Sequence, residues 1–277
     1  MKLVGVDGCR AGWVAASSEA AEAGASVLSD LTFSIVPTFT ALLDSLRGQR
    51  ALVAVDIPIG LPSGVPHDDG RRRADGAARA FLGPRRVSSV FSAPNRPTLD
   101  AVSYREACEL EVRARGGGLG LSQQTYRIIP KIRDVDGTIL LEHQGLPGPG
   151  PGVWAREVHP EVVFAALAGE GAPGHGLVHA KRRCTACVSP PCPGEDDRLA
   201  LLRRYVRDFE PRDARQQLLR EYAREAGQRG PVVGRDDVID AVACLVSALR
   251  ILTGQALTLP ADGPECDARG LRMEILA

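Results

Sequence analysis

The sequence predicts an α/β fold: a mixed five-stranded sheet, made of a three-stranded antiparallel meander plus parallel strands, flanked by helices and carrying extra helices. Two apolar runs, at 3–7 and 51–57, each lead to an Asp, as is typical of buried central strands that meet a loop. Helical patterns lie between the later strands, which favours a sheet covered by helices. With 277 residues, 44% of them hydrophobic and 25% charged, a single domain over 1–277 is expected.

The meander is expected at the start of the chain. Gly8 and Gly12 flank a tight turn after the first apolar run, and strand character resumes at 13–16. A third strand fits 31–36, where apolar and polar residues alternate. Three strands in succession predict an antiparallel arrangement of these three segments.

The later elements follow in an order that also bears on the fold. In chain order, the patterns predict a helix at 38–47, a strand at 51–57, helices at 71–82, 102–115 and 122–133, a strand at 153–158, a helix from 159, helices at 196–208 and 212–227, a long helix at 236–253, and short strands at 256–259 and 271–276. The Gly-, Pro- and Cys-rich stretch at about 169–197 is expected to be an excursion from the fold. A meander followed by α/β alternation is not the doubly wound order; it is the order of the ribonuclease H-like fold.

Acidic residues are expected to gather at one edge of the sheet. Asp7 and Asp56 end two apolar strands, and open α/β sheets bind ligands outside the carboxyl ends of their strands. Asp237 and Asp240 lie three residues apart on the long helix and therefore share one face. Turn formation is the alternative reading for the strand-end acids, and helix capping is the alternative for Asp236 and Asp237. Capping does not explain Asp240, one turn into the helix.

Such a group suits a hard divalent cation, because Mg²⁺ and Mn²⁺ favour oxygen ligands. The sequence therefore predicts that Asp7, Asp56, Asp237 and Asp240 bind Mg²⁺ or Mn²⁺ and carry catalysis. Glu157, at the end of the fifth predicted strand, is a further catalytic candidate, either as a metal ligand or as a general base. A role in packing alone is the alternative for Glu157.

A second metal site is suggested by the cysteine spacing in the excursion. Cys184, Cys187 and Cys192 follow a C-x₂-C-x₄-C pattern, with His179 upstream. These four residues match the ligands of a closed tetrahedral zinc site. The alternative is a Pro-rich loop whose thiols bind nothing.

Arginines after the fourth strand are candidates for nucleic-acid binding. Arg72, Arg79, Arg86 and Arg96 fall within one cluster and are expected to contact phosphates. The alternative is a solvated helix face. The formal net charge of zero argues against tight, non-specific binding of nucleic acid, since such binders are usually basic overall.

The sequence also predicts a cytoplasmic protein without a membrane segment. Its first residues turn polar at once, unlike a secretory signal, and no apolar run reaches the ~20 residues of a membrane span. Scattered cysteines fit reduced thiols in the cytoplasm. The oligomeric state stays open, with a dimer among the options.

The motifs taken together resemble the family labelled domain of unknown function 429, described as predicted nucleases with a ribonuclease H-like fold. The resemblance covers most of the chain, and its segments are VGVDGCRAGWV (4–14), VAVDIPIGLP (53–62), 82–94 with SSVFSAP, GLSQQTYRIIPKIRDVD (120–136), EVHPE (157–161) and DDVIDAVA (236–243). The acids are also similar in placement to those of Holliday-junction resolvases, which carry one on the first strand, one on the fourth and a D-x-x-D pair on the last helix. In the resolvases the fourth-strand acid is typically Glu, so the shorter Asp56 departs from that pattern.

The resemblance implies a divalent-metal-dependent nuclease, a hydrolase of phosphodiester bonds whose partner is a nucleic acid. Two other functions stay open: a non-catalytic nucleic-acid or nucleotide binding protein, and a phosphotransferase of the actin-like group. The latter usually needs a duplicated domain and a second glycine-rich loop, neither of which is clear in this sequence. The choice between DNA and RNA, and between endo and exo action, is not decided by the sequence.

Overall fold

The central sheet has five strands in the order β3-β2-β1-β4-β5. The computed structural model describes residues 1–19, 26–65, 67–145, 147–169, 193–226 and 232–277. The strands of the sheet are β1 (Lys2–Cys9), β2 (Gly12–Glu19), β3 (Thr32–Val36), β4 (Arg50–Val55) and β5 (Gly152–Glu157). β1 pairs antiparallel with β2, and β2 with β3. β4 lies parallel to β1 and to β5. The predicted mixed sheet, with its meander and parallel strands, is thus confirmed.

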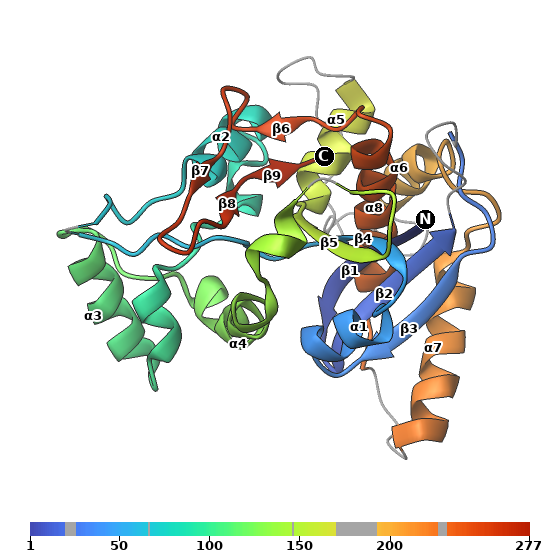
Figure 1. Cartoon of the computed structure of the whole chain (residues 1–277), viewed down its shortest axis with the longest axis horizontal. Coiled ribbons are helices and arrows are strands. Elements are labelled where there is room, and N and C mark those ends of the chain that lie inside the picture. The colour runs from blue at the N-terminus through green and yellow to red at the C-terminus, as the bar shows by residue number, and fades with distance from the viewer. Residues whose placement is uncertain (20–25, 66, 146, 170–192, 227–231) are drawn as a thin grey trace.

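Helices cover the sheet and extend beyond it. They are α1 (Phe39–Ser45), α2 (Arg73–Leu82), α3 (Tyr104–Ala114), α4 (Gln123–Thr138), α5 (Pro160–Gly169), α6 (Pro193–Leu202), α7 (Pro211–Ala226) and α8 (Arg235–Leu252), with 3-10 turns η1 (Val87–Ser89), η2 (Arg96–Asp100) and η3 (Leu141–Gln144). Figure 1 shows α3 at one end of the molecule and α7 at the other. None of the helices within the described ranges is long and apolar enough to cross a membrane.

Two hydrophobic cores lie on opposite faces of the sheet. Alternate side chains of β1 divide between them: Leu3 joins the core that contains α8, and Val4 joins the core that contains α4. This is the period-2 alternation of a strand covered on both faces. The face that carries Leu3 is the one that matters for the candidate site, because α8 lies on it.

The contact between α8 and β1 is unusually close. A Cβ atom added to Gly5 would lie 2.1 Å from the carbonyl oxygen of Ala241 and 2.1 Å from the backbone nitrogen of Leu245. Only a glycine therefore lets the helix backbone approach the strand to this distance. Residues Val238 to Leu249 of α8 are all buried, so the helix is held as a fixed part of the core.

Several boundaries differ from the sequence prediction. α4 continues past Pro130 to Thr138 because its buried stripe, Ile129, Ile132 and Val135, extends through the proline. The helix expected at 196–208 ends at Leu202, since the chain then turns and Val206 forms a β-bridge with Leu28.

The tail also holds more strands than expected. Two short antiparallel pairs join β6 (Thr258–Leu259) to β9 (Ile275–Leu276) and β7 (Glu265–Cys266) to β8 (Arg272–Met273). The second pair is closed by the carboxylate of Asp267, which accepts hydrogen bonds from the backbone N–H groups of Arg269 and Leu271. Two-residue strands of this kind carry too little periodicity to be recognised in a sequence.

Candidate functional site

Asp7 and Asp56 occupy equivalent positions at the carboxyl ends of two neighbouring parallel strands. Val6 of β1 is the register partner of Val55 of β4, and the N–H of Asp56 donates to the carbonyl of Val6 at 3.0 Å. The pairing therefore continues to the two aspartates, whose side chains share one face of the sheet. Both residues are half-buried. Strand alternation places them on the face of Gly5, where α8 packs.

Asp240 reaches the same edge from α8. It precedes Ala241, whose carbonyl lies against Gly5, and it is only 4% exposed. One turn further along, the buried thiol of Cys244 lies within hydrogen-bonding range of the backbone of Val6. Burial raises the pKa of this thiol well above its usual value, and Asp56, Asp7 and Asp240 raise it further, in that order. Three of the four predicted aspartates therefore lie within electrostatic range of one buried side chain.

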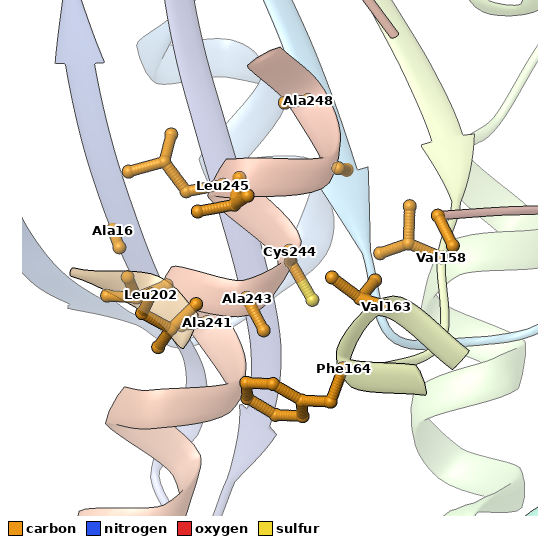
Figure 2. Packing of buried hydrophobic residues seen from close by; sticks show 14 of the residues in the cluster. Ala16, Val158, Val163, Phe164, Leu202, Ala241, Ala243, Cys244, Leu245 and Ala248 are labelled. Carbon is orange, nitrogen blue, oxygen red and sulfur yellow. The ribbon is translucent and has the colours of Figure 1, made fainter. Parts of the chain in front are cut away.

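The surroundings of Cys244 are otherwise apolar. Figure 2 shows it on α8 beside Val163 and Phe164 of α5, and all three residues belong to the core that includes α8. The carboxylates thus lie at the end of a dry helix–sheet interface. In such surroundings charges act on one another more strongly than they do in water.

Asp237 has a local structural role that the sequence only partly indicates. α8 begins at Arg235 with Gly234 as its N-cap, and the Asp237 carboxylate accepts the Gly234 N–H at 2.8 Å. This is the reciprocal half of a capping box. Asp236, the other capping candidate from the sequence, is exposed. Asp237 still lies close enough to the site to act electrostatically on Cys9 and Lys131.

The fit of this group to a divalent metal can be judged from its donors. Within the described part of the chain, no group of three or more His, Cys, Asp or Glu side chains is arranged to hold an ion as it stands. Mg²⁺, however, usually binds through one or two carboxylates, with waters and substrate phosphates completing its shell. The adjacent pair Asp7 and Asp56, with Asp240 beside it, offers donors of that kind, so the residues fit such an ion.

Lys131 also lies next to this site, although no motif in the sequence marks it. Its aliphatic chain crosses Gly8, where an added Cβ would lie 2.8 Å from Lys131 Cδ, and its ammonium donates to the carbonyl of Gly12. The ammonium also lies 4.4 Å from the centre of the Trp13 ring. Burial lowers the pKa of Lys131, and nearby acids, Asp7 among them, oppose that shift.

Comparison with known proteins places these residues in one family. A family model described as protein of unknown function (DUF429) matches residues 5–265. The chain belongs to the DUF429 family. The matched region includes Asp7, Asp56, Lys131 and Asp240. No curated protein and no solved structure matches the chain.

Glu157 of this DUF429 protein lies away from the aspartates. It is the register partner of Val55, so strand alternation puts it on the opposite face from Asp56. Its carboxylate, 5% exposed, pairs with Arg72 at 2.5 Å and accepts the N–H of Ile59 at 2.7 Å. These contacts hold the start of α2 against the end of β5. Glu157 therefore shares the sheet edge with the aspartates but not their face.

The four arginines assigned to nucleic acid are all engaged within the DUF429 chain. The side chain of Arg72 is wholly buried, which closes its guanidinium to a nucleic-acid phosphate. The other three are partly buried. Arg79 donates to the carbonyl of Val90 and to the hydroxyl of Ser92. Arg86 pairs with Glu161, and Arg96 pairs with Asp136 and Asp267. These hydrogen bonds and ion pairs connect loops and helices within the chain. For the three partly buried arginines, nucleic-acid binding stays a prediction.

The zinc prediction lies outside the described residues. Cys184, Cys187, Cys192 and His179 all fall within 170–192. The predicted structural zinc site of this DUF429 protein thus stays a prediction. The described cysteines Cys9, Cys108, Cys244 and Cys266 are free thiols, as the sequence led us to expect.

Proposed function

We propose that this protein is a divalent-metal-dependent nuclease that hydrolyses phosphodiester bonds, with Asp7, Asp56 and Asp240 as its main carboxylates and Asp237 beside them. The observation that carries the proposal is the register of β1 and β4, which sets Asp7 and Asp56 next to each other on the face of α8. The carboxyl edge of an open α/β sheet is the usual setting for a ligand site.

The chemistry of the group supports a metal-dependent reaction. Several carboxylates in one place repel both one another and a phosphate, so a cation is needed before a phosphodiester can bind. When bound, a divalent ion supplies charge that stabilises the transferred phosphoryl group and makes water a better nucleophile near neutral pH. Asp7 is oriented for this role by the N–H of Gly8, which donates to its Oδ1 at 2.7 Å. Asp240 is oriented by its burial on α8.

The proposal is tested by cleavage of end-labelled single-stranded, duplex and branched DNA and of RNA. We expect Mg²⁺ or Mn²⁺ to support cleavage and Ca²⁺ to support it poorly, because Ca²⁺ takes longer bonds and a looser geometry. Asp7→Asn and Asp56→Asn should each lower turnover by at least about 100-fold, since each removes a charge that the ion needs.

The matched control is Asp236→Asn, which removes one charge from the exposed first turn of the same helix. It should cleave within about twofold of the parent, because surface charges act weakly through water. Absence of cleavage of every substrate with either metal would reject the nuclease proposal. Binding of nucleic acid without cleavage would then favour the non-catalytic alternative.

A further inference from the structure

Lys131 approaches the aspartates from the opposite side of the sheet. It lies on α4, which packs in the other core, and its side chain crosses β1 at Gly8, the residue after Asp7. Cys9 and Gly12 pair across the β1–β2 turn, and the ammonium donates to the carbonyl of Gly12. The positive charge is therefore held at the turn that directly follows Asp7.

Two further contacts, with Gly8 and Trp13, keep this charge in place. Gly8 leaves room for the aliphatic chain, since an added Cβ would lie 2.8 Å from Lys131 Cδ and 2.9 Å from Cε. The ring of Trp13 lies beneath the ammonium, with its centre 4.4 Å away. Trp13 is fixed in turn, because its Nε1–H donates to the carboxylate of Asp134 at 2.8 Å. A half-buried ammonium with these contacts acts as a fixed charge rather than a mobile surface lysine.

We propose that Lys131 is a positioning residue whose fixed charge offsets the aspartates in the absence of an ion and weakens their affinity for a divalent cation. This inference rests on the proposed metal site and adds to it a determinant of metal affinity. The physical reason is repulsion between the ammonium and an incoming cation. The same acids also act on Lys131, since Asp7 and Asp237 counter the effect of burial on its pKa.

The size of the effect follows from Coulomb's law in partly hydrated protein. One positive charge and a divalent ion several ångströms apart repel each other enough to change affinity by roughly three- to thirtyfold. A charge-based effect shrinks with added salt, because ions screen it. Removal of the charge should therefore tighten metal binding, more strongly at low than at high ionic strength.

The experiment titrates the full, metal-stripped chain with Mn²⁺ and measures free Mn²⁺ by electron paramagnetic resonance. Lys131→Met keeps the length of the side chain over Gly8 and removes the charge, and Lys131→Gln is a second neutral variant. We expect both to bind Mn²⁺ roughly three- to thirtyfold more tightly than the parent. Lys131→Arg keeps the charge and should bind within about twofold of the parent. The gain of the neutral variants should shrink in high KCl.

Each outcome has a defined meaning. Equal or weaker Mn²⁺ binding by folded neutral variants overturns the role of Lys131 and leaves the metal site standing. A similar gain in Lys131→Arg also overturns it, since a merely structural effect would not depend on charge. Failure of the parent to bind Mn²⁺ any better than Asp7→Asn overturns both this inference and the proposed function. Thermal unfolding of each variant verifies that it is folded before it is titrated.

Discussion

The guanidinium of Arg72 donates a hydrogen bond to the buried carboxyl group of Glu157, with Nη2 and Oε2 2.5 Å apart. Asp75 lies 3.4 Å from the other terminal nitrogen of the same guanidinium. Two buried acids therefore share one cation. Burial raises the pKa of Glu157 to about 8, with Asp75 adding to the rise and Arg72 opposing it.

The stability of the protein should consequently fall as pH rises through the range set by Glu157. Its pKa in the folded chain, about 8, lies above its ordinary value of 4.5, so the folded state holds a proton that the unfolded state has lost. The stability that this retained proton contributes is fully present below pH 4.5 and is lost as pH rises to about 8. Urea unfolding across this range measures it.

Glu157→Gln is the matched control for that experiment, because the amide has a similar shape and does not titrate. The free energy of unfolding of the parent, relative to Glu157→Gln, should decline with rising pH and level off above about 8. A difference that grows with pH would show instead that Glu157 is ionised in the fold and that Arg72 dominates its pKa.

The close contact of α8 with β1 gives a second prediction. Gly5→Ala places a Cβ 2.1 Å from backbone atoms of Ala241 and Leu245, so the helix must move. Overpacking of a core costs about 1–3 kcal/mol or more, and we expect a loss at or beyond the upper end of that range. Urea unfolding at fixed pH measures the loss.

Gly76→Ala serves as the comparison for Gly5→Ala. Gly76 lies inside α2, and an added Cβ there meets no atom within 4 Å. Alanine is the better helix former by about 1 kcal/mol, so this variant should be as stable as the parent or more stable. If Gly5→Ala also left stability unchanged, α8 and β1 would not be held as closely as the structure has them.

The sheet and its acidic edge could be predicted because the relevant signals are local. Asp7 and Asp56 each end an apolar run, and parallel register alone then brings them together. Asp240 could be identified as a candidate site residue because it lies one turn beyond any capping position of the helix. These positions follow from periodicity, which a sequence carries in full.

The other features depend on contacts that no local pattern encodes. The face of Glu157 is set by its pairing with Val55, and a shift of one residue in a strand reverses the face. Lys131 hydrogen-bonds to Gly12, which lies more than a hundred residues away in the sequence. The helix that carries Lys131 has no motif that marks the lysine. Arg72 looked like part of a basic surface, yet it is buried between the carboxyl groups of Glu157 and Asp75.

The zinc prediction is tested by elemental analysis of purified protein. If Cys184, Cys187, Cys192 and His179 bind zinc, the parent should carry about one zinc per chain, and Cys184→Ser should carry markedly less. Cys266→Ser, which changes an exposed free thiol, should keep the metal. Zinc-free parent protein, purified without chelator, would contradict the prediction.

The last prediction concerns the stability of the aspartate group without metal. Asp7, Asp56 and Asp240 all act electrostatically on one buried thiol, that of Cys244, and like charges near one another repel. Asp7→Asn relieves part of this repulsion. Its amide oxygen can still accept the N–H of Gly8, the bond that Asp7 Oδ1 accepts in the parent. In the presence of a chelator, the thermal midpoint of Asp7→Asn should therefore equal or exceed that of the parent.

Added Mn²⁺ should reverse the order of the two midpoints. An ion that binds only the folded chain raises the free energy of unfolding by RT ln(1 + [L]/Kd), which is about 2.7 kcal/mol when [L] is 100 times Kd. The parent should gain this stabilisation and Asp7→Asn should largely lose it, while Asp236→Asn, altered at an exposed position of α8, should respond like the parent. A midpoint for Asp7→Asn several degrees below the parent in chelator would show that the carboxylate stabilises the fold by itself. The aspartate group would then be a structural cluster rather than a site held ready for a cation.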